Sequence, residues 1–391
     1  MSDIAQFFSP VDPGVILENI TLKEFQFGTL FSMHTSDSFP ELDEIDIAIV
    51  GVNESRNSGN NAGCNTAADA VRRYLYQLYG GSFSIRVADL GNINPGHSTE
   101  DTYFALRTTI DALIRKNVIP VIIGGSQDLT YPQFLGYKDL EQTINVVAID
   151  SVFDLGNPVA DISNSSYLGK IILHQPNYLF NYSNIGYQTY LVDQASLEMM
   201  NKLYFDVYRL GQVRDKIEEA EPMIRQADMI TFDITAIKHS DAPANPNASP
   251  NGFYAEEACQ MMRYAGMNDK LSSIGIYEIN PDFDVSGKTA HLAAQMIWCF
   301  MDGYYGRKSD FPNRTNPDYV RFHVVLQDEK YEINFYKSKK SDRWWMEIPY
   351  PPHQGLKFER HTLIPCSYKD YELAVNNEIP DRWWQTYQKL S

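Results

Sequence analysis

The chain has few basic residues for its length. Among 391 residues, 33 Lys and Arg stand against 50 Asp and Glu, which gives a formal net charge of −17. Binding to nucleic-acid phosphates depends on clusters of Lys and Arg, so this balance argues against a nucleic-acid partner. No run of about 18 apolar residues occurs, so no membrane-spanning helix is expected. The first residues show no basic segment followed by an apolar core, and we therefore expect a cytoplasmic protein without a signal peptide.

Cysteine is also scarce. The four cysteines are far apart and follow neither a metal-binding nor a disulfide pattern: Cys64, Cys259, Cys299 and Cys366. They are typical of buried thiols in a reducing compartment. Apolar material, in contrast, is plentiful, because hydrophobic residues make up 43% of the chain and aromatic residues 13%. This composition excludes a disordered or fibrous chain and allows a large packed core.

Short apolar runs alternate with helical patterns between residues 41 and 306. The predicted strands cover residues 45–52, 85–91, 118–125, 144–150, 228–234 and 272–280. Helical patterns lie between them, among others at residues 65–79, 101–117, 193–210 and 288–306. Continuous apolar strands alternating with helices indicate a parallel sheet that is covered on both faces. The predicted fold class is therefore α/β, a three-layer α/β/α sandwich, with any ligand at the carboxyl ends of the strands.

The two ends of the chain differ from this central region. Residues 1–40 are turn-rich and are interpreted as a lead-in segment. Residues 309–391 contain three segments with period-two alternation, which predicts a small β-rich extension. Three strands make a thin core, so this extension is expected to pack on the main domain through one apolar face. That face carries Phe322, Val324, Ile333, Phe335, Trp344 and Met346.

The tetrad DRWW occurs twice, at residues 342–345 and 381–384. Two interpretations stay open. The tryptophans either pack against the protein, with Asp and Arg forming a local ion pair, or form a surface patch for a partner. Neighbouring residues of a strand point to opposite faces, so one of Trp344 and Trp345 is expected to face away from the core. That residue would contact the second tetrad or another subunit.

Four strand-end segments carry a resemblance to a known family. In chain order they are GGSQDLT (124–130), IDSVFDLG (149–156), FDITAIKHSDAP (232–243) and GIYEINPDFD (275–284). With these segments the chain resembles the arginase/agmatinase/formimidoylglutamase (ureohydrolase) family over roughly residues 45–306. The resemblance implies an arginase-like sandwich with a mostly parallel sheet of about eight strands, and a homo-oligomer.

The family binds two manganese ions through six side chains, and the resemblance places their equivalents in this sequence. The three retained ligands are Asp150, Asp154 and Asp233. The other three positions, two histidines and an aspartate in the family, hold Gln127, Val152 and Thr235. We therefore expect no dinuclear manganese cluster. A site made only of oxygen ligands, with Gln127 or Asp128 adding a fourth, would suit one Mg²⁺, Ca²⁺ or Mn²⁺ ion.

The resemblance also indicates a substrate pocket. Glu278 matches the glutamate that grips a guanidinium, and with Asp154 it is a candidate catalytic residue. Gly156 replaces a substrate-binding Asn, and the loop that follows lacks the family's proton-carrying histidine. The candidate pocket residues are Gln127, Gly156, Asn164 and Glu278.

Structural alternatives to these roles stay open. The three aspartates would then only cap loops and helix starts, and Glu278 would be a hydrogen-bonded acid at a strand end. His239 lies in the third segment, six positions beyond Asp233, and is expected in a loop, with no role in metal binding.

Two functions follow from this pattern. In the first, the chain has lost the manganese-dependent hydrolysis and acts as a binding or assembly protein. In the second, it is an active hydrolase of a guanidino or imidoyl C–N bond, agmatinase-like or formimidoylglutamase-like, with a remodelled metal site. A small guanidino or imidoyl ligand is the expected partner in both, and a membrane or a nucleic acid in neither.

Overall fold

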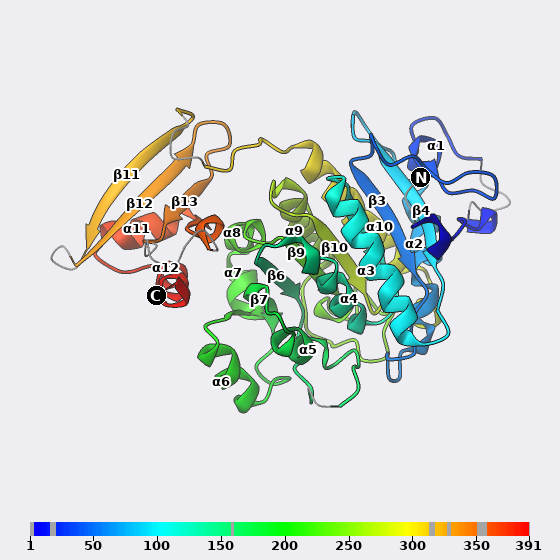
Figure 1. Ribbon diagram of the computed structural model, residues 1–391, viewed down its shortest axis with the longest axis horizontal. Coiled ribbons are helices and arrows are strands. Elements are labelled where there is room, and N and C mark those ends of the chain that lie inside the picture. Colours follow the sequence, from blue (N-terminus) through cyan, green and yellow to red (C-terminus); the bar gives the residue numbers. More distant parts are fainter. Residues whose placement is uncertain are drawn as a thin grey trace.

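The computed structural model describes residues 4–15, 21–157, 160–312, 317–326, 330–349 and 358–390. A ten-stranded sheet runs through its main part (Figure 1). Eight of these strands form a continuous parallel path, in the spatial order β4 (Val87–Ile93), β3 (Ile47–Val52), β5 (Ile119–Ile123), β10 (Ser273–Tyr277), β9 (Met229–Asp233), β6 (Ile144–Ile149), β7 (Leu179–Tyr187) and β8 (Asp206–Arg209). The predicted mostly parallel sheet is thereby confirmed.

Two short strands near the N-terminus extend the sheet beyond the eight strands expected. β1 (Phe8–Ser9) pairs antiparallel with β4, and β2 (Ser32–Met33) pairs with it in parallel. Between them, α1 (Phe27–Leu30) contributes Phe27 to the core. Strands of two residues are too short to show a hydrophobic period, so the sequence pattern could not reveal them.

Helices cover both faces of the sheet. One face carries α2 (Ala67–Leu75), α7 (Leu210–Asp215), α8 (Ala220–Arg225), α9 (Ala255–Met267) and α10 (Lys288–Tyr305). The other carries α3 (Thr99–Arg115), α4 (Thr130–Leu135), α5 (Tyr167–Leu173) and α6 (Gln194–Lys202). Within β3, Ile47 and Ile49 contact the first layer, and Ala48 and Val50 contact the second. Burial on both faces explains why this strand reads as a continuous apolar run. None of the described helices is long and apolar enough to cross a membrane.

One edge of the sheet differs from the sequence prediction. The helix predicted over residues 193–210 is wrong in its second half, because α6 ends at Lys202 and β8 follows. β7 is absent from the predicted strands, since polar residues interrupt its apolar pattern. Asn181 and Ser183 of β7 are buried and donate to the Asp206 carboxylate of β8, over 2.5 and 3.2 Å. Side-chain hydrogen bonds thus add to the apolar packing of Tyr182, Ile185 and Tyr187 at this edge.

The C-terminal residues form a second, antiparallel sheet of β11 (Tyr319–Leu326), β12 (Tyr331–Ser338), β13 (Trp344–Glu347) and β14 (Leu363–Cys366). This confirms the small β-rich extension. Two helices follow that the sequence prediction lacks, α11 (Tyr368–Val375) and α12 (Asp381–Leu390). They cover the apolar face that was expected to meet the main domain. Tyr371 stacks on Trp344 with ring centroids 5.0 Å apart, and the Trp383 indole donates to the Glu347 carbonyl over 3.0 Å.

The opposite face of the second sheet contacts the main domain through Trp345. The Arg225 guanidinium of α8 lies 4.3 Å from the centroid of this ring. It also donates to the carbonyls of Trp344 and Cys366, over 3.1 and 3.2 Å. Trp344 and Trp345 thus point to opposite faces of the sheet, as expected, but both are buried, because the main domain covers the face that carries Trp345.

The local ion pair proposed for the tetrad is wrong for its first copy. Asp342 pairs with Lys337 at 2.8 Å. Arg343 instead lies 3.7 Å from both Glu221 and Asp310. In the second copy Trp383 is buried and Trp384 is 37% exposed. Three of the four tryptophans are thus packed inside the protein.

Candidate metal centre

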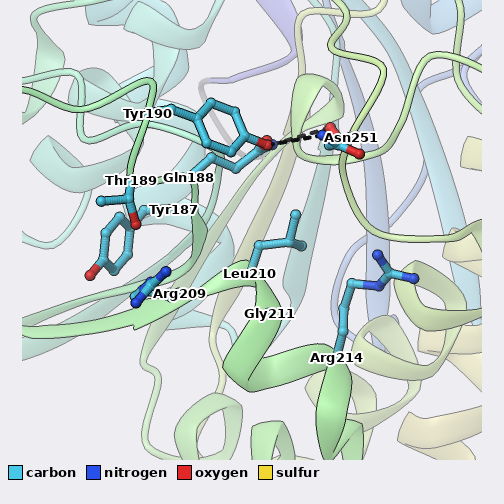
Figure 2. A pocket seen from close by; sticks show the side chains of 9 residues that line it. All are labelled: Tyr187, Gln188, Thr189, Tyr190, Arg209, Leu210, Gly211, Arg214 and Asn251. Carbon is cyan, nitrogen blue, oxygen red and sulfur yellow. Dashed lines mark hydrogen bonds between the residues drawn. The ribbon is translucent and has the colours of Figure 1, made fainter.

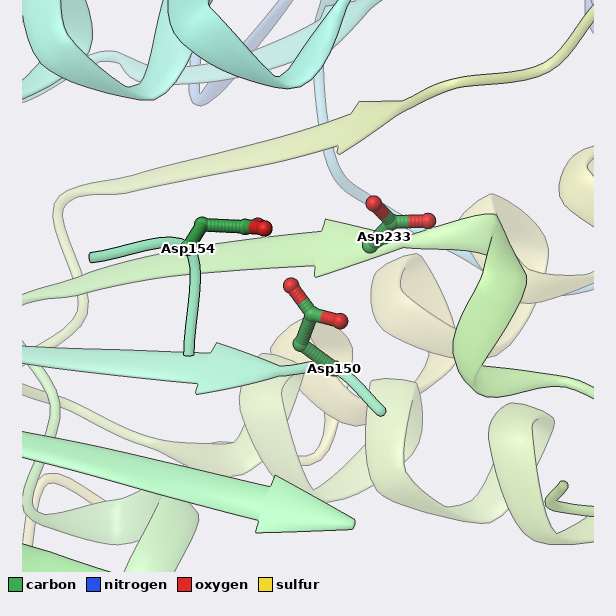
Figure 3. Close-up of side chains that lie close together, drawn as sticks. All are labelled: Asp150, Asp154 and Asp233. Atoms are coloured by element: carbon green, nitrogen blue, oxygen red, sulfur yellow. The ribbon is translucent and has the colours of Figure 1, made fainter. Parts of the chain in front are cut away.

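Three aspartates meet at the carboxyl ends of two neighbouring parallel strands. Asp150 follows β6, and Asp233 is the last residue of β9. Asp154 reaches the same place from the loop after β6, where its φ of 47° lies in the left-handed region. One carboxylate oxygen from each of the three lies within 4.8 Å of the others (Figure 3). The parallel register brings together residues that are far apart in the sequence.

Two of these aspartates also hold their own loops. One oxygen of Asp150 accepts the backbone N–H of Val152 over 3.1 Å, and one oxygen of Asp233 accepts that of Thr235 over 2.6 Å. These are capping bonds, so the structural interpretation of the aspartates holds for one oxygen of each. The second Asp150 oxygen, Oδ2, is buried and has no hydrogen-bond partner among the described residues. The capping bond therefore leaves one Asp150 oxygen without a donor in the described part of the chain, and this oxygen could bind a ligand.

The aspartates destabilise one another's charge. Burial raises the pKa of Asp150 well above its usual range, and the neighbouring Asp154 raises it further. Burial and the charge of Asp233 raise the pKa of Asp154. Burial and the charges of Asp150 and Glu278 raise the pKa of Asp233. Carboxylates so arranged must hold a proton or neutralise their charge with a cation.

The three positions that would complete a metal pair provide poor ligands. Gln127 donates through its side-chain amide to the Thr231 hydroxyl over 2.9 Å. Val152 has no side-chain donor, and its carbonyl accepts from the Asn184 amide over 2.8 Å. Thr235 contributes a hydroxyl, a weaker metal ligand than a carboxylate. This donor set does not fit two bridged manganese ions.

One hard divalent cation fits the same residues. An ion of the size of Ca²⁺ binds carboxylate oxygens at about 2.3–2.6 Å. Two oxygens on opposite sides of it therefore lie up to about 5 Å apart. The 4.8 Å limit on the separation of the three aspartate oxygens lies within that reach. Asp150, Asp154 and Asp233 would therefore hold a single ion.

Other buried polar atoms lie around the aspartates. The Gln127 side-chain oxygen and the hydroxyls of Tyr167 and Tyr182 have no hydrogen-bond partner among the described residues. Burial raises the pKa of Tyr167 and of Tyr182, and the charge of Asp150 raises both further. The two tyrosines thus belong to the surroundings of the centre. Sequence reasoning missed them, because Tyr167 lies in a helix and Tyr182 in the strand that the apolar pattern does not show.

Glu278 is held by four N–H groups. One carboxylate oxygen accepts from the Gln127 backbone over 2.8 Å and from Asn164 over 3.3 Å. The other accepts from Asn61 over 2.7 Å and from Asn245 over 3.4 Å. A carboxylate has about four acceptor positions, so these donors saturate it. The hydrogen bonds favour the interpretation of Glu278 as an acid that anchors a strand end, and its role as a ligand contact stays a prediction.

The structure also places Asp128 and His239. Asp128 accepts from the hydroxyls of Ser126 and Tyr103 and from the Asn57 amide, and it is not part of the group of clustered ligand atoms, so its role as a fourth metal ligand stays a prediction that the structure does not support. His239 is exposed, and the group of clustered ligand atoms contains no histidine.

The structure also gives a reason for glycine at position 156. Gly156 has a φ of 49°, and a Cβ atom there would approach the Ser166 Cβ to 2.2 Å. A substrate-binding side chain at this position would require the loop to move. Asn164, the other pocket candidate from the sequence, belongs to the Glu278 anchor through its amide.

Comparisons with known proteins agree with this geometry. A family model described as "Arginase family" matches residues 45–302. Formimidoylglutamase of Staphylococcus haemolyticus is 25% identical over 273 residues, which cover 66% of this chain and 86% of the relative. That of Photorhabdus laumondii is 24% identical over 262 residues, which cover 64% of this chain and 82% of the relative.

Solved structures show the same fold. Trypanosoma cruzi formiminoglutamase, crystallised with Mn²⁺, superposes with a TM-score of 0.65 at 19% identity, over 72% of this chain and 99% of that one. Bacillus subtilis formimidoylglutamase gives a TM-score of 0.66 at 20% identity, over 74% and 96% of the two chains. The predicted arginase-like fold is thereby confirmed, and the chain belongs to the arginase family.

Proposed function

We propose that this chain hydrolyses a linear amidine, as a formimidoylglutamase does, with one divalent cation in place of a manganese pair. The observation that carries this proposal is the meeting of three aspartate oxygens within 4.8 Å at the ends of β6 and β9. The curated relatives support the formimidoyl class of substrate, since they are named formimidoylglutamases. A guanidino compound is the alternative substrate.

The residues of the chain have separate tasks in this proposal. Asp150, Asp154 and Asp233 would hold the cation, which supplies a positive charge that polarises an amidine or a water molecule. Asp150 and Asp233 are already oriented by the backbone N–H groups of Val152 and Thr235. Asp154 is half-buried, and among the described residues no backbone N–H holds its carboxylate as those of Asp150 and Asp233 are held. It is therefore the candidate for exchanging a proton with the ligand.

A binding or assembly role without turnover is the second candidate. It is favoured by the state of Glu278, whose carboxylate is saturated by protein N–H groups and would have to exchange one of them for a substrate. Replacement of two imidazoles and a carboxylate by Gln127, Val152 and Thr235 supports the same reading. In either role we propose a homo-oligomer, on the basis of the family resemblance, which light scattering of the purified protein would test.

A substrate panel separates the two candidates. Metal-free protein is loaded in turn with Mn²⁺, Mg²⁺ and Ca²⁺, and formamide, urea and ammonia are measured with formimidoylglutamate, agmatine and arginine. Hydrolysis predicts release of formamide or urea that depends on the metal and is lost in Asp233→Asn. Saturable ligand binding by calorimetry without product supports the binding role. Absence of both product and binding contradicts both candidates.

A further inference from the structure

A cavity opens at the carboxyl ends of β7 and β8 (Figure 2). Its volume is about 280 Å³, near the lower end of small-molecule pockets. Nine residues form its wall, from the end of β7 and the loop after it, from the end of β8 and the start of α7, and from one further loop: Tyr187, Gln188, Thr189, Tyr190, Arg209, Leu210, Gly211, Arg214 and Asn251. The Gln188 backbone N–H donates to the Ser151 carbonyl over 2.9 Å, so this wall adjoins the loop that carries Asp150. The cavity nevertheless shares no lining residue with the aspartate cluster.

The cavity is lined by basic residues, although the chain as a whole is acidic. Two arginines line it, and none of its nine lining residues is acidic, in a chain of net charge −17. Arg214 is held in place from outside, by the Tyr254 ring 4.2 Å from its guanidinium carbon and by Glu257 at 3.3 Å. Arg209 bonds through its backbone N–H to Gln212, and its guanidinium has no ion pair in the described part of the chain. The Arg214 guanidinium is thus held in one orientation, and the Arg209 guanidinium could pair with an acidic ligand.

The space between the arginines is partly apolar. Figure 2 shows Leu210 and Gly211 between Arg209 and Arg214, and Tyr190 bonded to Asn251 across the cavity. The Asn251 amide donates to the Tyr190 hydroxyl over 3.2 Å. Guanidinium groups bind carboxylates in pairs of parallel hydrogen bonds, and Leu210 provides a surface for methylene groups. This arrangement suits a molecule with an acid at each end and a short aliphatic middle.

We propose that this cavity binds a small aliphatic dicarboxylate, with one carboxylate on Arg209 and the other on Arg214. The site is independent of the proposed hydrolysis, because its residues and those of the metal centre are different. The backbone hydrogen bond from Gln188 to Ser151 joins the wall of the cavity to the loop of the metal centre.

Titration calorimetry with glutarate tests the proposal. The protein is kept in EDTA, so that a cation at the aspartates cannot contribute. We expect saturable binding of glutarate, and Arg209→Gln and Arg214→Gln each to weaken it about tenfold or more, because each removes a charged hydrogen-bond pair. Arg86→Gln is the matched control, since this exposed arginine pairs with Glu44 at 2.6 Å on the surface, and it should leave binding unchanged. Thermal melting of each variant checks that the fold is intact.

Three comparisons complete the design. Glutaramide, the neutral diamide, should not bind, and inorganic phosphate should bind more weakly than glutarate. Glutarate should still bind to Asp150→Asn, which separates this site from the proposed catalytic one. Equal binding of glutaramide or phosphate, an unchanged affinity in both arginine variants, or no binding of glutarate to the folded protein would each overturn the proposal.

Discussion

The backbone N–H of Gln127 donates a 2.8 Å hydrogen bond to the carboxylate of Glu278. This bond joins the loop after β5 to the end of β10, its neighbour in the sheet. The Glu278 backbone N–H returns a bond of 3.0 Å to the Gly125 carbonyl, from a residue with a φ of 68°. These two hydrogen bonds hold the loop after β5 against the end of β10. They keep Glu278 in a left-handed backbone conformation that a non-glycine residue rarely adopts.

Removing the Glu278 carboxylate should destabilise the protein. In Glu278→Ala the buried Gln127 backbone N–H loses its acceptor, while the amides of Asn61 and Asn245 keep the Glu278 carbonyl. A buried polar group left without a partner costs about 1–3 kcal/mol, so we expect the free energy of unfolding to fall by about that amount. Denaturant unfolding measures this change, with the exposed Glu44→Ala as control. Equal stability of wild type and Glu278→Ala would show that Glu278 is no anchor.

The metal-free protein should lose stability as the pH rises. Because folding raises the pKa of Asp150, the folded protein holds a proton that the unfolded chain has already released, and the slope of stability against pH is negative there. Asp150→Asn resembles the protonated state at every pH. In EDTA we expect the variant to be more stable than wild type near neutral pH, and the difference to shrink as the pH falls toward the ordinary aspartate pKa of about 4. A difference independent of pH would contradict this account.

Restoring the missing ligands should restore the second metal. The triple variant Gln127→His, Val152→His, Thr235→Asp supplies two imidazoles and one carboxylate at the positions that lack them. We expect its manganese content, measured by elemental analysis after dialysis, to rise from one to about two ions per chain. The control variant Gln127→Asn, Val152→Ala, Thr235→Ser changes the same positions without adding strong ligands. Equal metal content in the two variants would mean that more than these side chains has been lost.

The two tetrads offer a matched pair of tryptophans. Trp345 is buried under Arg225, and Trp384 is 37% exposed. Truncating a buried tryptophan costs about 3–5 kcal/mol, so Trp345→Ala should lower the free energy of unfolding by that amount and Trp384→Ala by less than about 1 kcal/mol. Denaturant unfolding compares them. A larger effect on oligomeric state than on stability for Trp384→Ala would instead identify a partner surface.

The dependence of the main domain on residues 309–391 stays a prediction. Truncation after Gly306 would remove Trp345 and both carbonyls that pair with the buried Arg225. We expect the shortened chain to melt at a lower temperature or to aggregate. A soluble chain with unchanged melting temperature would show that the extension is an independent module.

The rule that parallel strands end at one edge of a sheet made much of the centre predictable. Asp150 and Asp233 follow apolar strands that are recognisable in the sequence, so their meeting could be expected. Asp154 came from the family resemblance, because its position depends on a left-handed turn. The amides that saturate Glu278 come from Asn61, Asn164 and Asn245, which lie on separate loops without any local pattern.

The remaining errors have one cause, which is that contacts outside a segment decide its structure. β8 forms because Asp206 receives hydrogen bonds from Asn181 and Ser183 of β7, and a local helical pattern does not show them. The second tetrad is helical because Trp383 packs under the second sheet and bonds to the Glu347 carbonyl. Period-two alternation identified the strands of that sheet, but it could not show which element covers each face.

Electron paramagnetic resonance of manganese added to the metal-free protein tests the central claim most directly. The account predicts one ion per chain with the spectrum of an isolated Mn²⁺, and its loss in Asp233→Asn, because one ion is assigned to Asp150, Asp154 and Asp233, whose ligand oxygens lie within 4.8 Å of one another. A spectrum of two exchange-coupled ions per chain, or no bound manganese in the folded protein, would contradict it.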